Sequence, residues 1–263
     1  MKKNLVVLFA IGWMVVSSIA RAESTTLASQ TGNDIGVSLS SYQYREQDLM
    51  SLTGAKIGLD LRTTKVLQHQ LFVRGDLRYA FGSVDYSGTG NSDGHQDWYL
   101  ETRGLVGKDW MIRGAGVSPY IGLGYRYLAN DLRGFTSTGY WGYRRESNYL
   151  YLPIGVTHRI ALNIRARLVT ELEYDHLLSG NQISRFSDGG GGYSDVTNNQ
   201  SSGYGLKLNV MYEKNNWAIG PYLHHWNIDQ SDTVLVYWNG SPYIVTEPKN
   251  DTVEFGMKAR QQF

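Results

Sequence analysis

The chain is dominated by short segments in which apolar and polar residues alternate with a period of two. In residues 71–82, for example, Leu71, Val73 and Leu77 alternate with Arg74, Asp76 and other polar or small residues. Successive side chains of a β-strand point to opposite faces, so each segment predicts a strand with one apolar and one polar face. Ten such segments are present: 33–44, 53–63, 71–82, 98–107, 119–128, 149–157, 164–175, 203–212, 217–226 and 252–263. The facing of residues 217–226 cannot be assigned from the pattern.

The lengths of these segments and of their connections suit a barrel that crosses a membrane. Each segment is close to the roughly 9–11 residues that a tilted strand needs to span a bilayer. Connections after the even-numbered strands are mostly short, whereas those after the third, fifth, seventh and ninth are long and polar. These longer connections are predicted to be external loops over residues 85–96, 130–145, 179–202 and 229–251.

Alternation also occurs in soluble β-sandwiches and barrels, so further features are needed to distinguish a membrane barrel from these soluble folds. The polar faces mix charges of both signs with small residues, which suits ion pairing inside a closed lumen. Tyr and Trp lie near the predicted strand ends, as in the aromatic girdles of membrane barrels. The sequence ends within a strand, at Phe263, and closure onto the first strand would leave no unpaired edge in lipid. We therefore predict an all-β fold, a transmembrane antiparallel up-and-down β-barrel of about ten strands.

The first residues have the pattern of a secretory signal peptide. Lys2 and Lys3 precede a mostly apolar run, and Ala20-Arg21-Ala22 has the small-x-small form of a cleavage site. We expect residues 1–22 to be the signal peptide and residues 23–263 the barrel; an uncleaved anchor is the alternative. The chain contains no Cys, so no disulfide can stabilise it. Without residues 1–22 the chain has 22 basic and 24 acidic residues, a net charge of −2, and this near-neutral balance argues against a nucleic-acid partner.

The C-terminal region resembles known outer-membrane barrels. Residues 253–263 resemble the C-terminal signal that the barrel-assembly machinery recognises: Phe263 and the alternating apolar positions match, and Gln261 departs from the pattern. Ile219-Gly220-Pro221-Tyr222, with the segment 247–252, is similar to small, uncharacterised outer-membrane barrel proteins of omptin size from Gram-negative bacteria. This resemblance covers about the final fifth of the chain. It implies the fold, a location in the outer membrane and partners in outer-membrane lipid, lipopolysaccharide and the assembly machinery.

The polar faces predict a network of charges within the lumen. A barrel of about eight strands is just filled by its own side chains, and wide channels need about 16–18 strands. A closed or barely leaky lumen is therefore expected, although glycines on the polar faces leave room for a small-solute path. The predicted network comprises Arg74, Asp76, Arg78, Glu101, Arg103, Arg126, Arg165, Arg167, Glu171, Glu173, Lys258 and Arg260.

No catalytic, cofactor or metal site is predicted. Omptin proteases use an Asp-x-Asp pair and an Asp-x-His pair on opposite rims, but Asp85, Asp93 and Asp97 do not form the first pair. Asp175 and His176 are adjacent, so they should face opposite sides of a strand. The same argument applies to the neighbouring His224 and His225, and no His-x-His or Cys spacing indicates zinc.

Three functions remain open from the sequence. The preferred one is a non-enzymatic outer-membrane protein whose external loops, rich in Tyr, Gly, Ser and Asn, mediate surface interaction or adhesion. The partner would be host matrix, another cell or a small extracellular ligand. The alternatives are a narrow, porin-like pore for small solutes and an omptin-like hydrolase.

Overall fold

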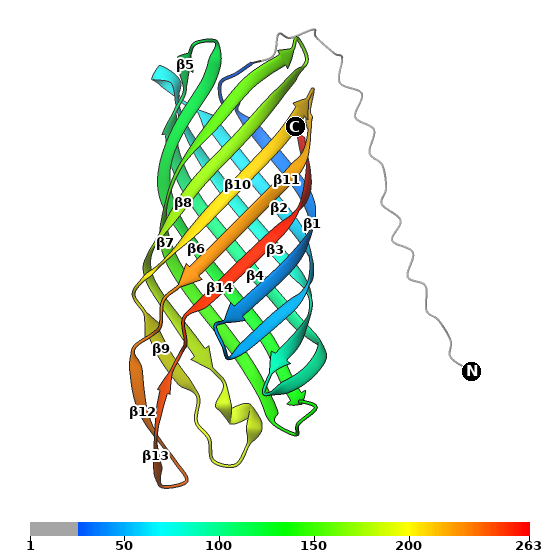
Figure 1. The fold of residues 1–263 in the computed structure, drawn as a ribbon. Coiled ribbons are helices and arrows are strands. Elements are labelled where there is room, and N and C mark those ends of the chain that lie inside the picture. Colours follow the sequence, from blue (N-terminus) through cyan, green and yellow to red (C-terminus); the bar gives the residue numbers. More distant parts are fainter. Residues whose placement is uncertain (1–25) are drawn as a thin grey trace, which may run out of the picture.

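A computed structural model describes residues 26–263 and shows a closed antiparallel β-barrel of ten strands (Figure 1). The predicted signal peptide, residues 1–22, lies outside the described residues. The prediction of ten barrel strands in up-and-down order is confirmed. The barrel strands are β1 (Gly32–Glu46), β2 (Met50–Val66), β3 (Leu71–Gly88), β4 (Gly90–Lys108), β6 (Ala115–Phe135), β7 (Trp141–Asn163), β8 (Ala166–Ser184), β10 (Gly203–Lys214), β11 (Trp217–Ile228) and β14 (Asn250–Gln262).

The barrel closes where the last strand pairs with the first. β14 runs antiparallel to β1, from the pair Glu46 and Asn250 to the pair Asp34 and Gln262. Beyond that pair, Phe263 exchanges two backbone hydrogen bonds with Asn33, of 2.9 and 3.0 Å. No helix among residues 26–263 is long and apolar enough to span a membrane.

The two ends of the barrel differ in the length of their connections. The end where β1 begins and β14 finishes, called here the turn end, has short links such as 164–165 and 215–216. The opposite end, called the loop end, carries the larger extensions and lies at the bottom of Figure 1. Short additional elements complete the chain: η1 (Gln68–Gln70), β5 (Trp110–Ile112), η2 (Phe186–Gly189), β9 (Val196–Gln200), β12 (Thr233–Trp238) and β13 (Ser241–Thr246).

Two of the predicted long loops are wrong, because the strands continue through them. β3 and β4 remain paired as far as Gly88 and Gly90, so residues 85–96 form the tip of a hairpin. Residues 130–145 likewise contain the paired ends of β6 and β7, and only 136–140 link them. Polar residues here indicated loops, but a strand beyond the bilayer meets water on its outer face and needs no apolar alternation.

The outer wall of the barrel is apolar. Leu39, Leu59 and Leu123 point outward and are each about half exposed, as are many Ile, Val and Phe side chains on other strands. Outward aromatic rings form a row toward the loop end: the Phe81–Tyr79, Tyr79–Trp98 and Trp98–Tyr127 centroid distances are 5.6, 5.8 and 5.2 Å. An apolar band next to aromatic rings is the surface that a bilayer and its interface require.

The structure also settles the facing of the segment at 217–226. Tyr222, His224 and Trp226 of β11 are buried in the lumen, whereas Ile219 and Leu223 face outward. The sequence was ambiguous because this strand places aromatic and imidazole rings in the lumen, where charges were expected.

Candidate functional site

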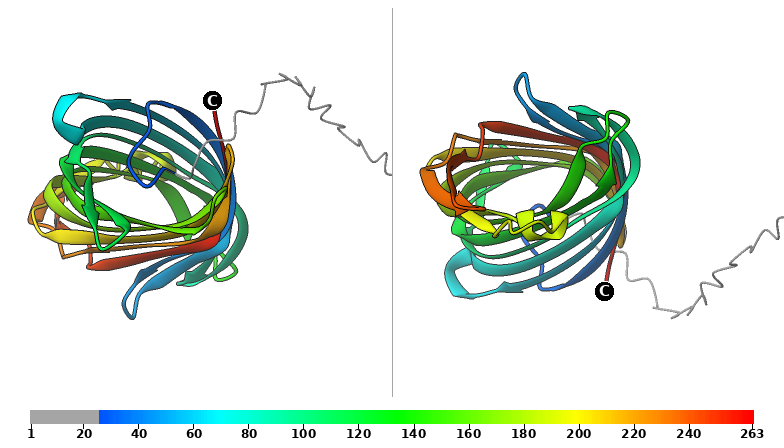
Figure 2. Two further views of the ribbon diagram at one scale, coloured as in Figure 1. Left: turned by 90° about the horizontal axis from the view of Figure 1, so that it is seen from above. Right: turned by 90° about the horizontal axis from the view of Figure 1, so that it is seen from below.

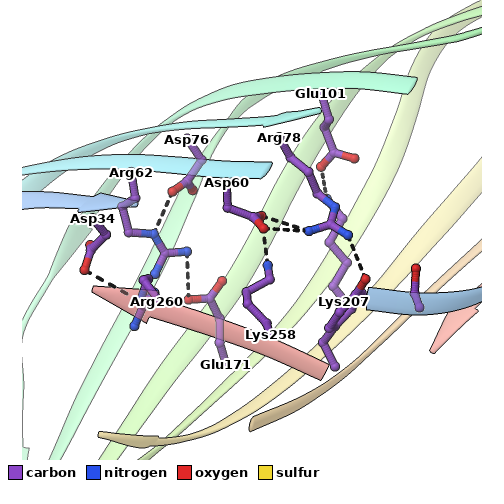
Figure 3. A network of polar contacts seen from close by, with 12 residues as sticks. Asp34, Asp60, Arg62, Asp76, Arg78, Glu101, Glu171, Lys207, Lys258 and Arg260 are labelled. Atoms are coloured by element: carbon purple, nitrogen blue, oxygen red, sulfur yellow. Dashed lines mark hydrogen bonds and ion pairs between the residues drawn. The ribbon is translucent and has the colours of Figure 1, made fainter. Parts of the chain in front are cut away.

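Charged side chains from β1, β2, β3, β4, β8, β10 and β14 meet in the lumen (Figure 3). One group surrounds Asp76 and is called here the Asp76 cluster: Asp76, Arg62, Arg74, Arg103 and Glu171. The Asp76 carboxylate lies 2.7 Å from Arg62 Nε, 2.9 Å from Arg103 Nε and 3.2 Å from Arg74 Nε. Glu171 in turn lies 3.1 Å from Arg74 Nη1 and 3.5 Å from Arg103 Nη2. Two carboxylates thus neutralise most of the charge of three guanidinium groups.

A second group surrounds Glu101. Its carboxylate accepts hydrogen bonds from Arg126 (2.9 Å), Lys207 (2.5 Å) and the Tyr151 hydroxyl (2.8 Å). Lys207 also lies 3.2 Å from Glu173 and 3.0 Å from Asp175. Arg103 pairs with Glu173 as well, so this group is continuous with the Asp76 cluster.

The third group is built around Glu254 on the last strand. Its carboxylate accepts hydrogen bonds from Arg78 Nη2 (2.7 Å) and from the hydroxyls of Tyr99 and Tyr222, both at 2.6 Å. Arg78 also pairs with Asp60 at 2.8 Å, and Lys258 bonds the same Asp60 at 2.9 Å. Buried charges persist only when they are paired and hydrogen-bonded, and each charge in this group meets that condition.

Aromatic rings fill the lumen between these charges and the loop end. The Arg126 guanidinium lies 3.9 Å from the ring centroid of Tyr99, and the Trp226 ring packs edge-on against Tyr151 at 5.1 Å. Glycine makes room for one of these rings, because a Cβ at Gly124 would overlap the ring of Tyr151. Buried charges and buried rings are therefore in direct contact in this part of the lumen.

The structure places most of the predicted network residues in this lumen, but not all of them. Arg167 and Arg260 both bond Glu213 at 2.6 Å, nearer the turn end. Arg165 is the exception: it is exposed in the turn between β7 and β8 and takes no part. The polar side of a strand predicts the lumen only while the strand continues, and Arg165 lies just outside both strands.

Several central members of the network were absent from the prediction. Asp60, Arg62, Lys207 and Glu254 all belong to it, and the alternation already put them on polar faces. The polar-face pattern could therefore have found them. The buried tyrosine hydroxyls carry no comparable signal, because Tyr is equally common on the outer surface.

A separate charged group is buried at the loop end. Arg145 Nη2 bonds Glu46 at 2.5 Å and also bonds Glu247, which lies in the connection between β13 and β14. Tyr44 donates a hydrogen bond to Glu46 at 2.9 Å. Burial raises the pKa of Glu247 to about 7, and the nearby Glu46 adds to the rise while Arg145 opposes it. The Glu247 carboxylate, which joins the connection between β13 and β14 to Arg145 of the barrel, therefore has a pKa near neutrality.

The most prominent external feature is the β12–β13 hairpin, a two-stranded sheet separate from the barrel sheet (Figure 1). One face packs on the barrel extension through Trp238, whose ring lies 5.1 Å from Phe186 and 5.2 Å from Tyr193. Trp238 Nε1 donates a hydrogen bond of 3.1 Å to Ser194, and the Asn198 amide donates one of 3.1 Å to Val245 O. These contacts fix the hairpin against β9 and its preceding turn.

The outer face of the hairpin is apolar and exposed. Strand register pairs Leu235 with Ile244 and Tyr237 with Pro242, so these four side chains share one face. Leu235, Tyr237 and Ile244 are 57%, 67% and 75% exposed. Residues 233–246 contain no charged side chain. We refer to these four residues as the hairpin face.

The turn end is occupied by the segment that precedes β1. The Ser29 amide and hydroxyl each bond the Asp109 carboxylate at 2.9 Å, and Ser118 bonds the same carboxylate at 2.5 Å. Arg159 donates to the Ser118 hydroxyl at 2.6 Å. Seen from above in Figure 2 (left), the dark blue segment lies across the opening of the barrel.

The acidic and histidine residues considered for hydrolysis are not assembled into one site. Asp175 is buried in the lumen beside Lys207, whereas His176 is exposed on the outer wall, as strand geometry requires. Asp97 is buried with Lys56 and Asn130, while Asp93 is exposed at the hairpin tip. His224 faces the lumen, and His225 bonds Asp251 at 3.2 Å. Within residues 26–263, no group of three or more His, Asp or Glu side chains is arranged to hold a metal ion.

Comparison with known proteins reveals similarity of fold alone. No protein-family model matches the sequence, and no curated protein sequence matches it. The crystal structure of the outer-membrane protease OmpT from Escherichia coli is similar, with a TM-score of 0.56 at 11% identity over 88% of this chain and 97% of that one. The β domain of the Bordetella autotransporter BrkA gives a TM-score of 0.42 at 13% identity, covering 89% of this chain and 100% of that one. The likeness to OmpT shows that the chain has the fold of an outer-membrane β-barrel.

Proposed function

We propose that this protein is a non-enzymatic, integral outer-membrane protein with its loop end outside the cell and its turn end in the periplasm. The apolar outer wall and the aromatic row support insertion in a bilayer. Short turns on the periplasmic side and larger extensions outside are the usual arrangement of such barrels. Export through cleavage of residues 1–22, contact with lipopolysaccharide and recognition of Phe263 by the assembly machinery belong to the same proposal.

Its function in this proposal is adhesion between cells, through association of the hairpin face with that of a second copy of the chain. The observation that carries it is the exposed, uncharged face formed by Leu235, Tyr237, Pro242 and Ile244. An exposed apolar sheet face outside the cell favours association with another apolar surface. Proteins that avoid such association usually place charged side chains on exposed sheets. Two copies would bring no like charges together at this face, so self-association meets no electrostatic penalty.

The anchoring of the hairpin supports a binding role. Trp238 and the Asn198 hydrogen bonds hold the inner face, so the outer face is presented in one orientation. Less conformational entropy is then lost on association than for a free loop. Tyr237 supplies the large, rigid aromatic ring that is enriched among residues dominating interface energies.

Cell aggregation tests the proposal directly. Cells that display the wild-type protein should aggregate and settle, and Tyr237→Ser combined with Ile244→Ser should abolish this while leaving the heat-modifiable gel mobility of the barrel unchanged. Tyr140→Ser is the matched control, because Tyr140 is 64% exposed on a different connection. Wild-type cells that stay dispersed, or aggregation that survives the double substitution, would refute it. Dispersed cells that adhere to immobilised matrix protein through the same face would assign the face to a host partner instead.

Neither alternative function gains support from the lumen. Paired charges and packed rings fill it, so planar-bilayer recordings should give no resolved open state; a resolved open state would favour the narrow pore. Asp175 and His176 lie on opposite faces of β8. A peptide-cleavage assay should therefore detect no turnover, and turnover lost in Asp175→Ala would favour a hydrolase.

A further inference from the structure

The lumen contains a cavity of about 120 Å³ between the turn-end segment and the charged groups of the barrel centre. Ala28, Ser29 and Gln30 line it at the turn end, and the Asp76 cluster lines it farther inside. A single water needs roughly 10–15 Å³ of such volume, so the cavity has room for a group of several heavy atoms.

Basic side chains outnumber acidic ones among the residues that line this cavity. Part of the compensating charge lies elsewhere: Glu173 and Asp175, which pair with Arg103 and Lys207, do not line it. Most of these cations are already paired with carboxylates, so the donors left for an occupant are those without such a partner.

Two donors on β7 are incompletely satisfied there. Thr157 is 2% exposed, lines the cavity, and its buried hydroxyl has no hydrogen-bond partner. Arg159, two residues along the same face, bonds the neutral hydroxyls of Ser118 (2.6 Å) and Ser29 (3.4 Å). Its carboxylate neighbour Asp109 lies 3.8 Å away and already accepts hydrogen bonds from both serines. A buried guanidinium whose ion pair is as long as 3.8 Å and a buried hydroxyl without a partner are both costly unless an acceptor fills the gap.

The lining carboxylates do not suit a cation. Glu171 is shared by Arg74 and Arg103, and Glu213 by Arg167 and Arg260. A metal or ammonium ion would have to displace these guanidinium groups. A small oxyanion, by contrast, offers only acceptor oxygens, which Arg binds strongly and a threonine hydroxyl also binds.

We propose that this cavity is a binding site for a small oxyanion of phosphate or sulfate size, held between Arg159 and the Thr157 hydroxyl. In the orientation of the proposed function, the anion enters from the periplasm beside residues 28–30. The buried rings around Trp226 pack beyond it, on the side of the loop end. The site depends on the geometry of the lumen and is independent of the hairpin face.

Calorimetric titration of the detergent-solubilised protein with inorganic phosphate, and separately with sulfate, tests this site. Both should bind saturably, whereas chloride at matched ionic strength should not. Charge-assisted hydrogen bonds contribute about 1.5–3 kcal/mol, so Arg159→Gln should weaken phosphate binding roughly 10- to 100-fold. Thr157→Val, which keeps the shape and removes the hydroxyl, should weaken it by about 3- to 10-fold.

Arg165→Gln is the matched control, because Arg165 is exposed at the same end of the barrel and does not line the cavity. Its phosphate affinity should equal that of the wild type. Heat-modifiable gel mobility establishes that each variant is folded before titration, and Arg159→Lys replaces Arg159→Gln if the latter fails to fold, with weakened binding again expected. The proposal would be overturned if the wild type did not bind phosphate saturably. It would also be overturned if the Arg159 and Thr157 variants bound phosphate with the affinity of the wild type.

Discussion

Replacing Glu254 by Gln isolates the contribution of charge in the lumen, because the two side chains have nearly the same shape. The Glu254 carboxylate is 1% exposed and accepts four hydrogen bonds: from Arg78, Tyr99, Tyr222 and, at 3.0 Å, Ser40. Glutamine keeps one acceptor oxygen, but its amide NH2 group faces donors that are hydrogen-bonded to the second carboxylate oxygen of Glu254. Arg78 keeps only Asp60 as an anionic partner.

The expected loss is large. Removing one partner of a buried ion pair typically costs about 3–5 kcal/mol, because the remaining charge stays buried. We expect a reduction of this size in the free energy of unfolding of Glu254→Gln. Part of it should be recovered in the double variant with Arg78→Gln, since the two groups interact directly.

The measurement is urea unfolding of the barrel in lipid vesicles, with the folded fraction taken from the difference in gel mobility between boiled and unboiled samples. Glu146→Gln is the control: Glu146 pairs with Arg185 on the outer wall, where both side chains are partly exposed, and ion pairs that solvent reaches contribute about 0–1 kcal/mol. If Glu254→Gln costs no more than this control, the lumen charges are screened by water and the reasoning about buried pairs is refuted.

Three further predictions concern other parts of the barrel. Leu123→Arg on the lipid face should destabilise the folded barrel by about 2–4 kcal/mol if residue 123 lies near the bilayer midplane. Urea unfolding in lipid vesicles measures this loss, and an unchanged unfolding midpoint would argue against lipid contact at residue 123. Gly124→Ala should cost about 1–3 kcal/mol by displacing the Tyr151 ring, and a truncating Tyr151→Leu in the same chain should relieve part of that loss. Because the pKa of Glu247 is raised in the folded state, its protonated form is favoured there, and stability should fall as pH rises from about 4.5 through about 7. Glu247→Gln should flatten this part of the stability–pH curve, and a slope unchanged from the wild type would contradict the assignment to Glu247.

The alternation of residues predicted the barrel because lipid and lumen impose opposite demands on successive side chains. In such a wall, Leu77 must face the lipid, and its neighbours Asp76 and Arg78 must face the lumen. The alternation of apolar and polar residues weakens where the strands leave the lipid. Beyond the bilayer, polar residues of β3 and β4 face water on the outer side, so Asp85 and Gln96 looked like loop residues although they belong to a paired hairpin.

The candidate sites were less predictable because they depend on contacts between distant strands. Thr157 and Arg159 form a site only because residues 28–30 fold into the opening and because Glu171 is already occupied by arginines. The hairpin face depends on the register that pairs Leu235 with Ile244. Local patterns specify which side a residue faces but not which partner from another strand it meets there.

The Glu254 group also has a consequence for how the barrel assembles. Its members come from β2, β3, β4, β11 and β14, and the last of these strands is the one that seals the wall against β1. An open sheet, in which β14 is paired with β11 but not yet with β1, would hold Glu254 beside Tyr222 but away from Arg78 and Tyr99. Contacts so far apart in sequence form late, after the entropy of chain closure has been lost. Sealing the wall and completing the lumen should therefore occur as one concerted step, and a chain stalled before that step would leave Arg78 with Asp60 alone and Glu254 without Arg78.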